Sequence, residues 1–362
     1  MAASGVDADR LALVRQAVEQ DVADRKYWGG AIRVTLHGET VLDFAVGHAD
    51  EAATQPLRHD TVFSIFSATK AFVNVLILRS IELGRLALTT RVSEIIPEFS
   101  GAPRDRATIL HFLTHTNGLP GVWEPRPGLY FDDLDEMVRE VVAHIHGANP
   151  PGARCDYSPM ANHVLLADVL RRIDPQGRSI NEILEQDLFD PLGMDDTRLG
   201  IRPHMRERHA FPDHRGIVPI KELSRNFPGD HGIFGAEKHE AVWMGAASTL
   251  SDLTAFASML RRGGELNGAR ILSPAMVRLA RRNHTGELPN ELYKAVALRA
   301  GYEVPPAYMG LGFSVRGTAI VKHQFGTLTS PETFGNYGAG STEFWIDPEL
   351  DLTFVGLSAG LL

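Results

Sequence analysis

Residues 61–84 read TVFSIFSATKAFVNVLILRSIELG, a strand pattern that leads directly into a helix pattern. The first five residues predict a short β-strand. From Ser67 onward, apolar residues occupy most of the helical circumference, which predicts a helix that is buried on nearly all sides. Leu83-Gly84 is typical of a helix end. Lys70 therefore lies in an apolar helix, where a charged ammonium group is costly to bury.

The segment Ser67-Ala68-Thr69-Lys70 has the spacing S-x-x-K. Residues three apart share one face of a helix, so the hydroxyl and the amine are expected within hydrogen-bond reach. Burial lowers the pKa of a lysine, and the neutral amine can then accept a proton and activate the serine. The spacing alone is a weak signal. Its place directly after a strand, at the start of an apolar helix, makes Ser67 a candidate nucleophile.

The composition of the chain narrows its class. The chain has 362 residues and a formal net charge of −9, which argues against non-specific binding to nucleic acid. The sequence contains no apolar run of about 18 residues, the length that would indicate a membrane helix, and residues 1–20 lack a signal-peptide pattern. With Cys155 as its one cysteine, the chain forms no internal disulfide. These features predict a cytoplasmic protein, and they leave its oligomeric state open.

β-rich patterns lie at both ends of the chain and helical patterns in the middle. A hairpin is expected over 30–47, and C-terminal strands at 310–315, 319–323, 343–346 and 352–357. The economical arrangement is an α+β fold, in which one antiparallel sheet from both chain ends is flanked by helices and a mainly helical domain is inserted. The predicted domains are residues 1–85 with 245–362, and residues 86–244, with the active site at their junction.

Three other patterns could carry chemistry, and a plainer interpretation is preferred for each. Residues 356–360 match G-x-S-x-G, but no room follows for the acid and histidine that this motif needs, so the end of a strand is predicted. Cys155 is interpreted as a core residue. Five histidines have irregular spacings without a metal-binding motif, so a polar loop and no metal site are predicted. They are His204, His209, His214, His231 and His239.

Two further segments add to the candidate site. Tyr157 precedes a predicted helix, where a neighbouring cation can lower the pKa of its phenol and let it act as a base. Residues 335–341 read GNYGAGS, and a glycine-rich strand lets backbone N–H groups approach a substrate closely. Taken singly, a packed tyrosine and an ordinary turn explain the two segments as well.

Together these segments resemble the serine β-lactamase and penicillin-binding-protein superfamily, and within it the class C-like branch of family VIII carboxylesterases and related acyl-transfer enzymes. Six stretches match in order. They are FSIFSATK at 63–70, LTHTNGL at 113–119, YSP at 157–159, PLGMDDT at 191–197, GGELNG with LSP at 263–274, and FGNYGAG with DP at 334–348. The resemblance covers most of the chain and implies a β-lactamase/transpeptidase-like fold.

The resemblance implies a role for each candidate residue. Ser67 is the acylated nucleophile, Lys70 relays protons, and Tyr157 is the general base that returns a proton to the leaving alcohol. The oxyanion hole consists of the backbone N–H groups of Ser67 and Ala339. No metal and no organic cofactor are implied.

Two positions depart from the pattern of the superfamily. Pro159 stands where lactam-cleaving members mostly have Asn, and Asn336 stands where the third motif has Lys or His. With Tyr337 and Gly338, Asn336 is expected to bind substrate through hydrogen bonds, without a charge. The departures disfavour a penicillin-like substrate that bears a carboxylate, and they leave ester hydrolysis intact.

The sequence therefore predicts a serine hydrolase that cleaves a carboxylic ester of a small molecule. The alternatives are an amide hydrolase or acyltransferase with the same chemistry, a β-lactamase or D-Ala-D-Ala peptidase, and a non-catalytic scaffold. An apolar pocket lining is expected from four aromatic side chains, for which ordinary packing is an equal alternative. They are Trp123, Tyr130, Phe234 and Trp243.

Overall fold

The computed structural model describes residues 5–212, 232–339 and 341–360. Its helices are α1 (Ala8–Ala23), α2 (Lys70–Glu82), α3 (Val92–Ile95), α4 (Ile109–Leu113), α5 (Leu134–His144), α6 (Ala161–Ile173), α7 (Ile180–Leu184), α8 (Asp190–Leu192), α10 (Leu250–Arg261), α11 (Pro274–Ala280) and α12 (Glu291–Arg299). Its strands are β1 (Gly29–Leu36), β2 (Glu39–Gly47), β3 (Val62–Ser64), β4 (Arg198–Leu199), β5 (His209–Ala210), β6 (Ala246–Thr249), β7 (Glu265–Leu266), β8 (Ala269–Arg270), β9 (Ser314–Val315), β10 (Phe334–Gly338), β11 (Thr342–Asp347) and β12 (Leu352–Ser358). Of the helices in these ranges, none is long and apolar enough to cross a membrane.

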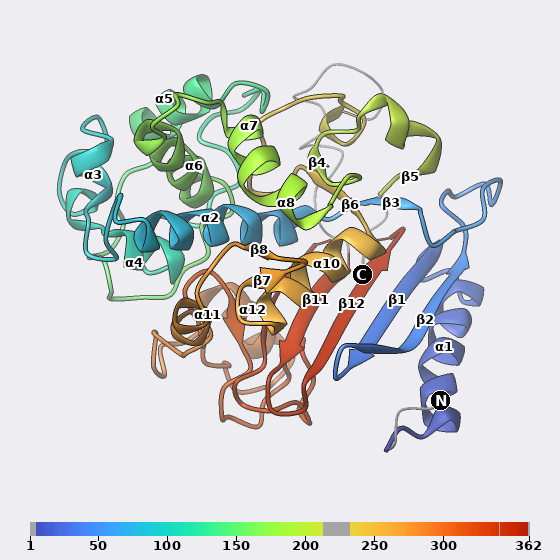
Figure 1. Cartoon of the computed structure of the whole chain (residues 1–362). Helices are drawn as coiled ribbons and strands as arrows, with labels where there is room; N and C mark the ends of the chain where they lie inside the picture. Colours follow the sequence, from blue (N-terminus) through green and yellow to red (C-terminus); the bar gives the residue numbers. More distant parts are fainter. Residues whose placement is uncertain (1–4, 213–231, 340, 361–362) are drawn as a thin grey trace.

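A six-stranded antiparallel sheet forms one side of the molecule, in the order β2-β1-β12-β11-β10-β9 (Figure 1). The N-terminal strand β1 pairs with the C-terminal strand β12, from Gly30 opposite Ser358 to Leu36 opposite Leu352. Both ends of the chain therefore build one sheet, and the predicted α+β fold is confirmed. The domain boundaries given from the sequence stay a prediction.

Helix α2 runs between the main sheet and the helical part of the molecule (Figure 1). Its residues from Lys70 to Leu78 are all buried. The ring of Phe72 contacts Phe189 edge-on at 5.0 Å between ring centroids, and it contacts Phe256 of α10 at 4.9 Å. The helix is thus packed from both sides, as its all-round apolar pattern predicted, and it holds Lys70 in an apolar interior.

The short strand β3 does not belong to the main sheet. It pairs with β5 in parallel and with β6 in antiparallel fashion, in a second sheet of order β4-β6-β3-β5. The single sheet expected from the sequence is therefore wrong at this point. All three residues of β3 are buried, so apolar and polar residues do not alternate along it. The sequence pattern therefore does not indicate which sheet the strand joins.

The C-terminal part has less regular structure than predicted. Of the strand expected at 310–315, only β9 forms, because the Gly310 N–H donates to the carbonyl of Phe313 within a turn (2.8 Å). The strand expected at 319–323 is wrong, and Ile320 is 90% exposed there. The buried Arg316 guanidinium donates to the carbonyl of Ala319, so a side chain and not a neighbouring strand satisfies this backbone.

Candidate active site

Ser67 lies in the 3₁₀ turn η1 (Phe66–Thr69), between β3 and α2. Strand β6 holds this junction, because the Ile65 N–H donates to the Ala246 carbonyl (2.9 Å) and the Ala246 N–H donates to Thr69 Oγ1 (3.1 Å). Phe66 has a φ of +48°, a left-handed conformation that is rare for an aromatic residue. The neighbours of Ser67 thus fix a strained turn, as is common at functional sites.

The structure brings Ser67, Lys70 and Tyr157 together. Lys70 Nζ lies 3.1 Å from Ser67 Oγ, and it donates a hydrogen bond to the Trp243 carbonyl at 2.7 Å. The Tyr157 hydroxyl donates to Ser67 Oγ at 2.9 Å. Lys70 Nζ also lies 5.0 Å from the centroid of the Tyr157 ring. The serine oxygen is therefore in hydrogen-bond contact with both groups that the sequence singled out.

Burial acts in opposite directions on the two groups beside Ser67. It lowers the pKa of Lys70 well below its usual value, which favours the neutral amine. It raises the pKa of Tyr157 above its usual range, more than the hydrogen bond to Ser67 lowers it. In the resting site, Lys70 is therefore predisposed to accept a proton and Tyr157 keeps its own.

The third-motif strand β10 lies against the turn that carries Ser67. A Cβ atom on Gly338 would come within 2.4 Å of the Ile65 carbonyl oxygen, so only glycine permits this approach. The Thr342 hydroxyl donates to the same oxygen at 2.8 Å. Ala339, the expected oxyanion donor, directly follows Gly338. Asn336 lies two residues before Gly338 and donates from Nδ2 to the Gly312 carbonyl at 3.1 Å.

His115 adjoins the site, and sequence reasoning assigned it no role. Its ring centroid lies 4.9 Å from that of Tyr157, and its carbonyl accepts the N–H of Asp156 at 3.0 Å. Burial, with a smaller effect from Lys70, lowers the pKa of His115 to about 3, so the ring is neutral. His115 therefore braces the tyrosine segment. Its position within LTHTNGL was the available signal.

The four expected lining residues separate into two pairs. Phe234 and Trp243 are buried, and the ring of Phe234 contacts Phe66 at 5.1 Å between centroids. Trp243 serves the site through its backbone carbonyl, while its indole packs on Phe131 at 4.9 Å. Trp123 and Tyr130 lie at the surface, with 43% and 45% of their area exposed. Ordinary packing therefore accounts for the side chain of Trp243.

The other patterns noted in the sequence have plain explanations where the structure describes them. Ser358 is the last residue of β12, and Cys155 is buried as predicted. His209 and His239 are buried, His204 is exposed, and His214 and His231 lie outside the described residues. In the described chain, no group of three or more His, Cys, Asp or Glu side chains could hold a metal.

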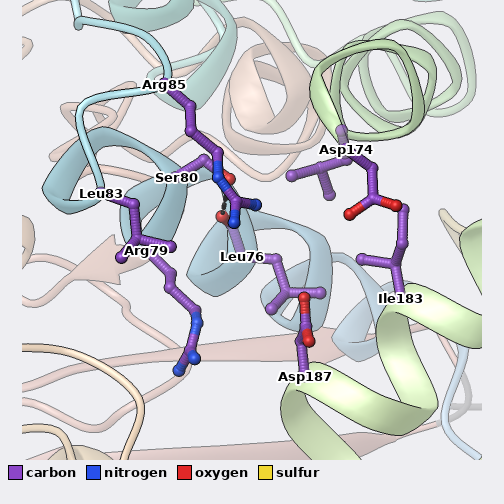
Figure 2. A pocket seen from close by; sticks show the side chains of 9 residues that line it. Leu76, Arg79, Ser80, Leu83, Arg85, Asp174, Ile183 and Asp187 are labelled. Atoms are coloured by element: carbon purple, nitrogen blue, oxygen red, sulfur yellow. Dashed lines mark hydrogen bonds between the residues drawn. The ribbon is translucent and has the colours of Figure 1, made fainter. Parts of the chain in front are cut away.

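A small cavity lies beside the C-terminal half of α2 (Figure 2). Leu76 of α2 lines it together with the carboxylates of Asp174 and Asp187. Both carboxylates form ion pairs with Arg178, at 2.8 and 2.9 Å. The cavity contains none of the predicted site residues and is explained as part of a structural ion-pair cluster.

Comparisons with known proteins cover nearly the whole chain. A family model described as beta-lactamase matches residues 14–361. Esterase EstB of Burkholderia gladioli is 35% identical over 234 residues, which are 59% of this chain and 57% of EstB. Esterase/beta-lactamase LipL of Mycobacterium tuberculosis is 26% identical, covering 97% of this chain and 81% of LipL. A penicillin-binding-protein homologue from Caulobacter crescentus has a TM-score of 0.78 at 26% identity, covering 99% of this chain and 94% of that one.

The fold and the serine–lysine–tyrosine arrangement define a β-lactamase-like serine enzyme. The chain belongs to the β-lactamase family. The resemblance found in the sequence and the β-lactamase/transpeptidase-like fold are thereby confirmed, as is the general class of a serine hydrolase.

Proposed function

We propose that this protein is a serine esterase, which hydrolyses carboxylic esters of small molecules through an acyl-enzyme on Ser67. The observation that carries the proposal is the contact of Ser67 Oγ with both Tyr157 and Lys70, at 2.9 and 3.1 Å. An unactivated serine is a weak nucleophile, and a neighbouring base is what makes it reactive. The similarity to EstB, an esterase, supports an ester as the substrate.

The lowered pKa of Lys70 and the raised pKa of Tyr157 determine the order of proton transfers in acylation. The neutral Lys70 amine takes the Ser67 proton as Oγ attacks the ester carbonyl. The backbone N–H groups of Ser67 and Ala339 stabilise the oxyanion. Tyr157 gives its phenolic proton to the leaving alcohol and regains one from Lys70. Water then attacks the acyl-enzyme by the reverse proton transfers and releases the acid. This order makes Lys70 the base, and the role of Tyr157 as base, implied by the resemblance, stays the alternative.

The third motif supports an ester over a β-lactam. Asn336 carries no charge, whereas a lysine or histidine at this position would attract a substrate carboxylate. Pro159 offers no amide side chain near the catalytic tyrosine. Both residues therefore favour a neutral ester over a penicillin or a D-Ala-D-Ala peptide.

Three alternatives have weaker support. Amide hydrolysis and acyl transfer to an alcohol use the same contacts at Ser67, so only the substrate or the acceptor distinguishes them. A non-catalytic scaffold has no need for a buried lysine beside a serine, which is costly to maintain. The cytoplasmic location and the absence of nucleic-acid and membrane partners stay predictions.

Ester turnover is expected to exceed β-lactam turnover by about 10²-fold or more in kcat/KM, because the charge–charge contact that is missing at Asn336 weakens the lactam transition state. The measurement compares p-nitrophenyl butyrate with nitrocefin, using Ser67→Ala as the blank. Comparable turnover of the two substrates would contradict the preference for esters. Absence of Ser67-dependent turnover across an ester and amide panel would contradict the enzymatic proposal itself.

The value of kcat/KM is expected to fall as the pH is lowered. Lys70 must be neutral to accept a proton, and its lowered pKa keeps it neutral above that pKa and charged below it. Lys70→Arg should be inactive at every pH, because the guanidinium stays protonated. The measurement is kcat/KM against pH, with circular dichroism to verify folding. A rate that stays flat or rises toward acid would exclude Lys70 as the base.

A further inference from the structure

A chain of hydrogen bonds runs through the buried interior behind the catalytic residues. It begins at the loop after α4, where Asn117 Oδ1 accepts the Leu119 N–H at 2.9 Å and Asn117 Nδ2 donates to Asn162 Oδ1. Asn162 Nδ2 in turn donates to the Phe112 carbonyl at 3.0 Å and lies 3.3 Å from His163 Nδ1. Asn117 and Asn162 are at most 1% exposed, so these bonds are fully shielded from water.

The chain continues from α6 to α2 through His163. Its Nε2 lies 3.1 Å from Asn74 Oδ1, and Asn74 Nδ2 donates to the Gly312 carbonyl at 2.8 Å. A carbonyl only accepts, so the amide nitrogen of Asn74 must face Gly312 and its oxygen must face His163. His163 therefore donates from Nε2 and accepts at Nδ1. From Asn117 to Asn74, each side chain donates one hydrogen bond in the direction of Gly312, and Asn162 Nδ2 donates in addition to the Phe112 carbonyl.

The network ends on the third motif. Asn336 donates from Nδ2 to the same Gly312 carbonyl at 3.1 Å, so Asn74 and Asn336 share one acceptor. Gly312 lies directly against Asn74, because a Cβ on Gly312 would come within 2.4 Å of the Asn74 Cβ. Asn74 follows Lys70 by four residues and thus occupies the same face of α2. The catalytic helix and β10 are therefore tied through one carbonyl oxygen.

This arrangement orients the amide group of Asn336. Its nitrogen donates one of its two N–H groups to Gly312, so Oδ1 is directed away from that carbonyl and is available as an acceptor for a ligand. Asn336 and Gly338 share one face of β10, and Gly338 on that face contacts the turn that carries Ser67. Asn336 therefore offers a hydrogen-bond acceptor beside the nucleophile, at the position where a cation would offer a donor. An acceptor attracts a hydroxyl or an N–H and repels a carboxylate.

We propose that Asn74, oriented by His163, is a positioning residue that fixes Asn336 with its amide oxygen toward the substrate, so that the site selects neutral acyl groups with a hydrogen-bond donor near the scissile carbonyl. The inference rests on the proposed esterase function and specifies its substrate class. In this view, Asn336 determines specificity directly, and Asn74 and His163 act through it.

The test compares esters that differ by one hydroxyl. The p-nitrophenyl esters of 2-hydroxybutyrate and 3-hydroxybutyrate are measured against p-nitrophenyl butyrate, and the selectivity is the ratio of their kcat/KM values. The wild type is expected to prefer at least one hydroxy ester by about tenfold, the effect of one buried hydrogen bond. Asn336→Leu should remove this preference. Asn74→Leu should reduce it although Asn336 is intact. Since selectivity is a ratio, a general loss of folded enzyme does not change it.

Asn74→Asp tests the direction of the network. The ionised carboxylate of this variant has no hydrogen to donate, so its oxygen would repel the Gly312 carbonyl oxygen. The protonated acid can donate to that carbonyl and accept from His163. The selectivity of this variant relative to wild type should therefore recover as the pH falls. The titratable groups around His163 are Lys70 and His115, and their protonation affects both esters of one protein alike, so it cancels in the selectivity ratio.

The outcomes separate the two proposals. If the wild type hydrolyses none of the esters in a Ser67-dependent way, the proposed function fails. If it hydrolyses hydroxylated and plain esters equally, the function stands and the specificity inference is overturned. If Asn336→Leu loses the preference while Asn74→Leu keeps it, or Asn74→Asp shows no recovery, Asn74 has no positioning role. Should Asn74 variants fail to fold, His163→Gln and His163→Leu replace them, because only Gln offers an N–H to Asn74 and should retain more selectivity.

Discussion

Ser67→Ala is expected to lower kcat/KM for p-nitrophenyl butyrate by about 10⁴-fold or more, the effect of removing the nucleophile of a catalytic unit. The substitution removes the oxygen atom that contacts both the Tyr157 hydroxyl and Lys70 Nζ. A serine-reactive fluorophosphonate should add one covalent adduct to the wild type and none to the variant. Intact-protein mass spectrometry measures the adduct, and release of p-nitrophenol measures the rate.

Ser80→Ala is the matched control for this experiment. Ser80 is buried on the same helix and donates to the Leu76 carbonyl at 2.9 Å, far from the catalytic contacts. Its loss should leave both the adduct and the turnover close to wild type. An adduct that persists in Ser67→Ala would place the nucleophile elsewhere. Equal turnover in the two variants would remove Ser67 from the reaction.

The catalytic core was predictable because its signal is local. Ser67 and Lys70 are three residues apart, and the apolar helix that follows them dictates that the lysine is buried. Tyr157 lies 90 positions along the chain from Ser67 and was placed by resemblance, since no spacing rule brings the two together. The observed 2.9 Å contact is a tertiary result that periodicity does not contain.

The unpredicted features depend on single side chains that satisfy distant backbone. The Arg316 guanidinium donates to the Ala319 carbonyl in place of a neighbouring strand. The alternation of apolar residues near Ala319 gave no indication of this bond. Asn74 is a polar residue in an apolar helix to which the sequence assigned no role, and its contacts with His163 and Gly312 depend on the tertiary structure. Helix α12 gave no sign in the sequence, because three of its apolar residues, Leu292, Val296 and Leu298, face solvent and give no buried stripe.

Tyr157→Phe is expected to reduce kcat/KM by about 10²-fold or more, the usual contribution of a positioned proton donor or acceptor. The change removes the hydroxyl that contacts Ser67 and keeps the ring that packs on His115 at 4.9 Å. If Tyr157 protonates the leaving alcohol, the loss should be larger for ethyl butyrate than for p-nitrophenyl butyrate, because p-nitrophenolate leaves without a proton. The measurement is the kcat/KM of both esters in both proteins.

The pH profile of Tyr157→Phe then identifies the base. Burial lowers the pKa of Lys70 and raises that of Tyr157, so the fall in activity toward acid should persist in the variant if Lys70 is the base. Tyr27→Phe is the control variant. It removes a phenol hydroxyl that lies 3.4 Å from Asp21, away from the site, and it should keep wild-type rates. Loss of the acid limb in Tyr157→Phe would assign the base to Tyr157. An equal loss for both esters would instead limit the Tyr157 hydroxyl to holding Ser67 in place.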